Sequence, residues 1–165
     1  MKSAIKYLFL IITFLIVSCG VYEEEEKNKI KLKNKKTEKT IKSTLTTKPS
    51  ETIDLTNKGI GPIKSITLPA EINQQMVAEG EAVFKRLCSA CHRVGKKFIG
   101  PAPNGLLKKR TPEWIMNMLL DPEGMAKNDP LAISLLKEYN GSPMVNQNLT
   151  ENQARAILEY FRTLE

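Results

Sequence analysis

One short stretch constrains this chain more than any other, namely Cys88-Ser89-Ala90-Cys91-His92. It contains two of the three cysteines and the only histidine of the 165 residues. A C-x-x-C-H run is typical of covalent haem attachment. The two thiols lie one helical turn apart, so each can form a thioether with one haem vinyl group, and the histidine then lies under the iron as an axial ligand. The sequence therefore predicts a haem site at residues 88–92.

Three other interpretations of the motif explain it less well. A structural zinc site needs four Cys or His ligands, and this stretch offers three. A thioredoxin-like dithiol usually accompanies a βαβ pattern, which the sequence does not show. A plain disulfide between Cys88 and Cys91 would leave His92 without a role. Haem attachment is the favoured interpretation.

The N-terminus has the features of an export signal. Two lysines precede an apolar run, residues 7–17, which is shorter than the about 20 residues that a membrane-spanning helix needs. The run ends in the letters IVSCG, which resemble the lipobox of bacterial lipoproteins. This resemblance implies that residues 1–18 are a lipoprotein signal peptide and that Cys19 carries a lipid anchor. The alternative is an ordinary signal peptide followed by an unmodified cysteine.

Export fits the haem motif, because haem attachment of this kind is completed outside the bacterial cytoplasm. We therefore expect an exported protein that is lipid-anchored to a bacterial membrane. Its haem domain would lie in the periplasm or on the cell surface.

Residues 19–70 are expected to form a disordered, lipid-anchored linker rich in Lys and Glu. Such a composition cannot bury enough apolar surface to offset the conformational entropy lost on folding. Residues 1–70 carry 13 Lys/Arg and 7 Asp/Glu, whereas residues 71–165 carry 12 and 11. The net charge of +7 is thus mainly a property of the N-terminal arm, and it does not indicate nucleic-acid binding. A flexible tether would let the haem domain move between partners at the membrane, and a sharper hypothesis is that the lysines bind anionic lipid.

Residues 71–165 predict a small all-α domain without strands. Apolar periodicity and capping residues place four helices, at residues 76–87, 112–121, 130–139 and 151–164. Gly80 falls in the middle of the first helix, where we expect it to allow close approach of another helix. A domain of about 95 residues has a limited core. A covalently bound haem would supply much of the surface that these helices bury.

The second axial position needs another donor, because the chain has no second histidine. A methionine thioether is the obvious candidate, and the choices are Met76, Met116, Met118, Met125 and Met144. The first three lie on expected helices. Met144 follows Gly141-Ser142-Pro143 in an irregular stretch that could fold its sulfur over the iron, so it is favoured. Met125, in an expected loop after Pro122, is the second choice.

Residues 71–165 resemble the class I c-type cytochromes, which carry one haem. The resemblance rests on the haem motif, Gly80 and Phe84, Gly100-Pro101, Trp114, Met144 and Tyr160-Phe161. It implies a small cytochrome c fold of about four helices around one covalent haem c, with the first and last helices crossing at the glycine and the aromatic residues. It also implies that the Pro101 carbonyl accepts a hydrogen bond from His92 and that Trp114 binds a haem propionate. Pro103 departs from the pattern, which often has a leucine there.

These assignments imply a one-electron carrier and not an enzyme. With His92 and Met144 both on the iron, no position is left for a substrate, and no acid–base or nucleophile constellation is visible. The expected partners are redox proteins, and the haem domain is expected to be monomeric. Residues 85–110 contain eight basic side chains and no acidic one, which fits an acidic partner surface as well as it fits two solvated clusters. The alternatives are a haem-based sensor or small-ligand binder, and a cytochrome subunit of a larger oxidase or dehydrogenase complex.

Overall fold

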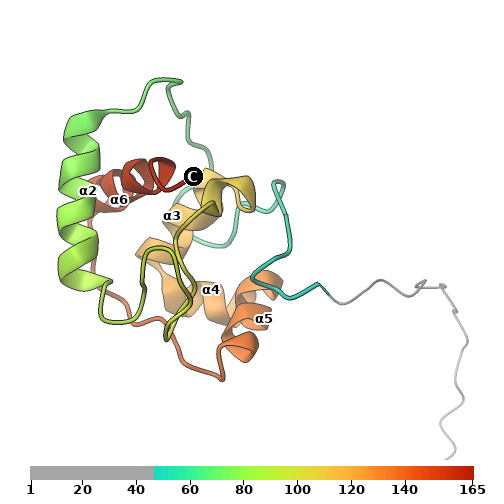
Figure 1. Cartoon of the computed structure of the whole chain (residues 1–165). Coiled ribbons are helices and arrows are strands. Elements are labelled where there is room, and N and C mark those ends of the chain that lie inside the picture. Colours follow the sequence, from blue (N-terminus) through green and yellow to red (C-terminus); the bar gives the residue numbers. More distant parts are fainter. Residues whose placement is uncertain (1–46) are drawn as a thin grey trace, which may run out of the picture. The chain divides into compact units, whose positions relative to one another are not determined.

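The structure is a computed structural model that describes residues 47–165, and over this range it is all-helical (Figure 1). The helices are α2 (Gln74–Leu87), η2 (a 3-10 turn, Leu106–Lys108), α3 (Pro112–Leu120), α4 (Pro122–Asn128), α5 (Pro130–Glu138) and α6 (Glu151–Arg162). Among residues 47–165, extended pairing is limited to isolated bridges such as Asp54 with Arg110. No helix in the described range is long and apolar enough to cross a membrane. The predicted signal peptide, Cys19 and the linker up to residue 46 lie outside the described residues.

The three helices predicted after the haem motif, α3, α5 and α6, begin at the capping residues that the sequence indicates. The side chains of Thr111 and Asp129 accept hydrogen bonds from backbone N–H groups in the first turn, and a proline follows each of them. Thr150 and Gln153 form the expected capping box at the start of α6. These local signals fix the helix starts, and the predicted all-α fold is confirmed.

Helix α4 was missed, because residues after Asp121-Pro122 were expected to form a loop. The Asp121 side chain caps this helix by accepting from the Gly124 N–H at 2.9 Å, and Pro122 occupies its first turn. The same Asp-Pro signal opens α5, so the signal was available in the sequence. The helix has only seven residues, which is too short for a clear apolar period.

Helices α2 and α6 pack against each other at the glycine that the sequence singled out. A Cβ at Gly80 would collide with the Ala156 carbonyl oxygen of α6. One turn later, the Phe84 ring packs against Tyr160 and Phe161, with ring centroids 5.7 Å and 5.8 Å away. The missing side chain therefore lets the two backbones touch, and the aromatic cluster fills the space beside the contact.

The predicted range of the linker, residues 19–70, needs a correction. Its last part, residues 47–69, is ordered, and we call it the N-terminal strap. The strap packs along the helical domain before α2 begins (Figure 1). Ile63 is buried in the core, and its N–H and carbonyl both bond the Asn117 side chain, at 2.9 Å each. Residues 47–69 therefore belong to the folded unit that the prediction had begun at residue 71. The composition averaged over residues 19–70 concealed this, because the strap is held by specific polar contacts and not by an apolar period.

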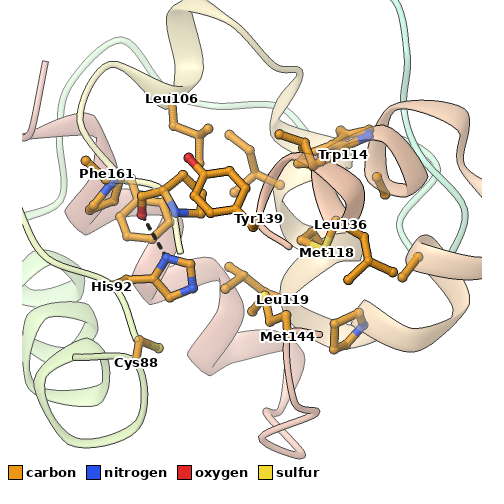
Figure 2. Close-up of a pocket in the computed structure, with 18 of the residues that line it drawn as sticks. Cys88, His92, Leu106, Trp114, Met118, Leu119, Leu136, Tyr139, Met144 and Phe161 are labelled. Carbon is orange, nitrogen blue, oxygen red and sulfur yellow. Dashed lines mark hydrogen bonds between the residues drawn. The ribbon is translucent and has the colours of Figure 1, made fainter. Parts of the chain in front are cut away.

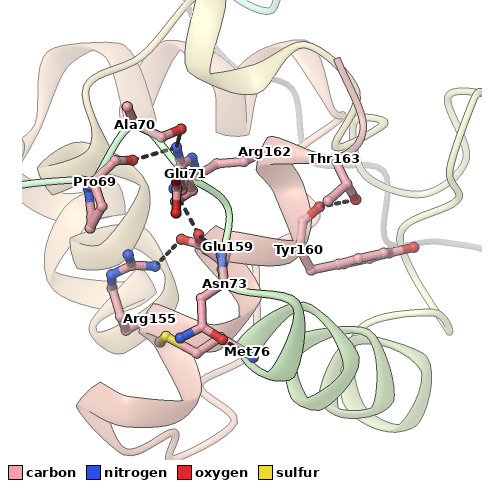
Figure 3. A network of polar contacts seen from close by, with 10 residues as sticks. All are labelled: Pro69, Ala70, Glu71, Asn73, Met76, Arg155, Glu159, Tyr160, Arg162 and Thr163. Atoms are coloured by element: carbon pink, nitrogen blue, oxygen red, sulfur yellow. Dashed lines mark hydrogen bonds and ion pairs between the residues drawn. The ribbon is translucent and has the colours of Figure 1, made fainter.

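A buried carboxylate joins α6 to the segment that leads into α2 (Figure 3). Glu159 is fully buried, and it accepts hydrogen bonds from the Asn73 N–H at 2.8 Å and from Arg155 and Arg162 at 2.5 Å and 2.7 Å. Arg162 also donates to the Pro69 carbonyl at 2.7 Å. Burial opposes ionisation of Glu159, but the Asn73 N–H and the two arginines together bring its pKa below the ordinary value. The network fixes the start of α2, the helix that ends in the haem motif.

We predict that Gly80→Ala destabilises the holoprotein by about 1–3 kcal/mol, because the added methyl group forces the α2–α6 contact apart. Helix propensity alone would favour alanine by about 1 kcal/mol. Ala78→Gly is the matched control, since Ala78 lies on the exposed side of the same helix, and it should cost about 1 kcal/mol through propensity. Urea unfolding of both variants checks this. A more stable Gly80→Ala protein would contradict the close contact.

Glu159→Gln should lower the free energy of unfolding by about 3 kcal/mol near neutral pH, because it leaves the partly buried Arg155 and Arg162 poorly compensated. The folded-state pKa of Glu159 lies below the ordinary 4.5. The contribution of the carboxylate is therefore fully present above the unfolded pKa and is lost as pH falls through the folded pKa. In urea unfolding, the difference in unfolding free energy between the wild type and Glu159→Gln should become small below about pH 4. The exposed Glu151→Gln control should change stability by less than about 1 kcal/mol, and a pH-independent gap for Glu159→Gln would refute the assignment.

Candidate functional site

A pocket with almost entirely apolar walls lies between the end of α2 and helices α3, α4 and α5 (Figure 2). Its lining comes from nearly every element of the domain, and it includes Phe84, Cys88, His92, Pro101, Pro103, Leu106, Trp114, Ile115, Met118, Leu119, Pro122, Ala126, Leu135, Leu136, Tyr139, Met144 and Phe161. Such a surface suits a large apolar group and not a polar metabolite. Of the predicted site residues, Cys88, His92, Pro101, Trp114 and Met144 all line it.

His92 is held in one orientation and one tautomer. Its N–H bonds the Cys88 carbonyl at 2.9 Å, which continues the turn after α2. Its Nδ1 lies 2.8 Å from the Pro101 carbonyl oxygen, as the resemblance implied (Figure 2). A carbonyl can only accept, so Nδ1 carries the proton and Nε2 keeps its lone pair. The imidazole is thus prepared to donate Nε2 to a metal ion, with its other nitrogen held by the backbone.

Gly100 allows this arrangement. A Cβ at Gly100 would overlap the His92 ring, so only glycine lets the loop lie against the imidazole face. The Gly100 N–H also bonds the Cys91 carbonyl at 2.9 Å, which joins the loop to the haem motif. Gly100 and Pro101 therefore act together. The glycine leaves space for the imidazole ring, and the proline carbonyl accepts the hydrogen bond from His92 Nδ1.

Of the two cysteines of the motif, Cys88 lines the pocket and Cys91 does not. Cys88 is buried in the wall, whereas Cys91 is exposed, and neither forms a disulfide. Burial, with a smaller contribution from Cys91, raises the pKa of the Cys88 thiol to about 11. The buried sulfur is therefore neutral, which suits a thioether in an apolar wall. The Cys88 sulfur in the wall, an exposed Cys91 three residues on, an oriented imidazole and apolar walls together fit a haem bonded through Cys88 and Cys91.

The pocket separates the five methionine candidates. Met118 and Met144 line it, and Met76, Met116 and Met125 do not. The second choice, Met125, is fully buried in α4, where its sulfur accepts the Ile60 N–H of the strap at 3.0 Å. Met125 therefore has a structural partner in the strap and lies outside the pocket lining, which favours Met144 over it. Met144 lies in the irregular segment before α6, as expected.

Trp114 lines the pocket, but its indole N–H has a different partner from the haem propionate that the resemblance implied. Its indole N–H donates to Asp129 Oδ1 at 3.1 Å in the buried space behind the pocket. The expected donation to a haem propionate is therefore not the arrangement in this structure. Sequence reasoning identified Asp129 only as the N-cap of α5. No local signal could have shown that the same carboxylate also fixes the tryptophan of α3.

Comparisons with known proteins agree with this geometry. The family model for cytochrome c matches residues 77–165, which is more than half of the chain. Cytochrome c from Rhodothermus marinus is 43% identical, with 63% of this chain and 89% of that chain covered and a TM-score of 0.61. An engineered form of that cytochrome is 42% identical over 63% of this chain and 90% of that chain, also with a TM-score of 0.61. A second structure of the engineered protein, bound to a carbene intermediate, is 42% identical, covers 63% and 89%, and has a TM-score of 0.58. A comparison with curated proteins gave no match.

The fold and the pocket define a haem-binding helical protein. The family match makes the class specific, and the chain belongs to the cytochrome c family. It carries one haem c, bound covalently through Cys88 and Cys91, and it transfers electrons through that haem.

Proposed function

We propose that this chain is a membrane-tethered one-electron carrier whose haem iron is ligated by His92 and Met144. The observation that carries the proposal is that a correctly oriented imidazole and the thioether of a non-helical segment line the same apolar pocket. Bound haem c supplies an Fe(III)/Fe(II) couple to this site. A His/Met pair leaves the iron closed to other ligands and raises its reduction potential.

The protein side of this function is to hold both ligands still while the charge on the iron changes. The Pro101 carbonyl prevents rotation of His92, since any turn of the ring would break the 2.8 Å hydrogen bond. The pocket walls exclude water around the iron, which lowers the local dielectric response and favours the less charged state of the centre. Both effects let an electron enter and leave without rearranging the ligands.

Met144 is preferred over Met118 because of where each residue lies in the chain. Met118 belongs to α3, a helix whose other side chains are packed in the core, so its position is set by the helix. Met144 belongs to residues 142–149, which have no regular structure and can adopt the course that the iron requires. A partly buried sulfur on such a segment has the reach and the freedom of a ligand.

The surface next to the haem motif supports docking of an acidic redox partner. Residues 93–99 follow His92 directly and expose Val94, Phe98 and Ile99. Two cations accompany this apolar surface, because Arg93 stacks on Phe98 and Lys96 is exposed. An apolar centre with a cationic rim is typical of a transient interface with an acidic surface.

Not every basic side chain of residues 85–110 is available for this role. Arg110 is buried beneath the strap. Lys85 pairs with Glu81 at 2.8 Å, Lys108 pairs with Glu165 at 3.1 Å, and Lys97 lies over the Tyr139 ring. Within residues 47–165, Lys96 is exposed, forms no ion pair and lies next to the exposed apolar side chains of residues 93–99, so we choose it to test steering of a partner.

Export and lipid anchoring complete the proposal. They rest on the apolar run of residues 7–17 and on the lipobox-like sequence that ends at Cys19 and Gly20. A lipid on Cys19 would retain the haem domain at a membrane while leaving it free to meet soluble or membrane-bound partners.

Met144→Ala should abolish the weak far-red absorption band that marks thioether ligation of oxidised haem, and the reduced variant should bind CO readily. Met118→Leu is the matched control, because it removes the other methionine of the pocket and should keep the band. Absorption spectra of the two oxidised holoproteins decide between the ligands. Loss of the band in Met118→Leu alone would contradict the assignment to Met144.

Lys96→Glu should slow oxidation of the reduced protein by ferricyanide several-fold at low salt. The ferricyanide anion would no longer be attracted by the Lys96 ammonium group near the haem motif. The difference should disappear at about 1 M salt, where screening is strong. Lys64→Glu changes the net charge equally, at an exposed position outside residues 85–110, and it should have a smaller effect. Equal rates for the two variants in stopped-flow experiments would contradict local steering at the haem motif.

A further inference from the structure

The strap holds helix α5 at both of its ends. At the first end, Asn57 Nδ2 donates to Asp129 Oδ2 at 2.7 Å, while Asp129 Oδ1 caps α5 by accepting the Ala132 N–H at 2.8 Å. At the other end, the Ser50 N–H and hydroxyl donate to the two carboxylate oxygens of Glu138, at 2.7 Å and 2.5 Å. A bidentate pair on an ionised carboxylate is one of the stronger kinds of hydrogen bonding.

Apart from the strap, helix α5 is positioned by its packing against α4 and by the side chains with which it lines the pocket. It has nine residues, and Ala132 is the only one of them that is fully buried. Leu131 and Leu135 are partly buried against the core. A short helix with so little buried surface is easily displaced. The polar contacts with the strap therefore add the constraints that hold the two ends of α5.

The strap is itself held in place by hydrogen bonds to residues 109 and 110. The buried Arg110 guanidinium donates to the Pro49 carbonyl at 2.7 Å and also to the Thr52 carbonyl. The Asp54 N–H donates to the Lys109 carbonyl at 2.9 Å. These contacts tie the strap to the residues that immediately precede α3, which forms the other wall of the pocket.

Helix α5 leads directly to the proposed ligand. After Glu138 the chain turns through Asn140 and Gly141, both at positive φ, and the Gly141 N–H bonds the Leu136 carbonyl at 2.8 Å. Met144 follows three residues after that glycine. The end of α5 is therefore the last regular structure before the sulfur, and it sets where the irregular segment that carries Met144 begins.

We propose that the strap is a positioning element for the sixth iron ligand: Ser50 and Asn57, acting through Glu138 and Asp129, hold α5 so that Met144 stays on the iron. This inference rests on the proposed His92/Met144 ligation. It assigns to residues outside the pocket a role in the strength of the thioether–iron bond. It also means that the strap, and not only the segment around Met144, influences how readily the sulfur leaves the iron.

The test is an imidazole titration of the oxidised full-length holoprotein, followed by loss of the far-red band. Imidazole competes with Met144, so its apparent affinity measures how readily the sulfur leaves. Glu138→Ala and Asn57→Ala should each bind imidazole about tenfold more tightly, the factor expected for losing hydrogen bonds to a charged group. Glu123→Ala removes an exposed carboxylate of α4, and Thr56→Ala removes a hydroxyl whose bond stays within the strap. Both controls should titrate like the wild type.

A double-mutant cycle separates positioning from general loosening of the fold. If the strap acts through the sulfur, Glu138→Ala should leave imidazole affinity unchanged in a Met144→Ala background. Equal tightening in both backgrounds, or a loss of thermal stability with no change in imidazole affinity, would overturn the proposal. Should Glu138→Ala fail to fold, Ser50→Ala removes only one of the two bonds and carries the same test. A wild type without a Met144-dependent far-red band would instead refute the ligation itself, so the two failures are distinguishable.

Discussion

The hydrogen bond from His92 Nδ1 to the Pro101 carbonyl is the contact on which the site depends. It joins the end of α2 to the loop over the pocket, and it fixes which nitrogen faces the iron. The rest of the domain supports this contact. The α2–α6 crossing at Gly80 and the Glu159 network set the direction of α2, while Gly100 gives the imidazole its room. Helices α3, α4 and α5 then close an apolar space that suits a bound haem.

The features that could be predicted from sequence were local. The haem motif, the Thr-Pro and Asp-Pro helix starts and the Thr150 capping box each depend on residues within one turn of each other. Gly80 was also identifiable, because a glycine in mid-helix has few explanations other than close packing. The resemblance to a family added the pairing of His92 with Pro101, which lies nine residues away.

The features that were missed depend on contacts between distant residues. The strap has no apolar period, and it is ordered through single partners such as Asn117, Arg110 and Glu138, which lie 54 to 88 positions further along. The Trp114 N–H was expected at a propionate, but it is taken by a carboxylate whose capping role had seemed sufficient. Buried polar groups must find a partner somewhere, and the sequence does not say which one.

One measurement tests the central claim most directly, namely a potentiometric titration of the full-length holoprotein with the reduced form exposed to CO at the end. A closed His92/Met144 site predicts a single reversible one-electron transition, during which the far-red band of the oxidised form disappears, and no reaction with CO on mixing. An oxidised spectrum without that band, together with immediate CO binding, would contradict electron transfer through a closed iron. It would favour a protein that binds small ligands at the haem.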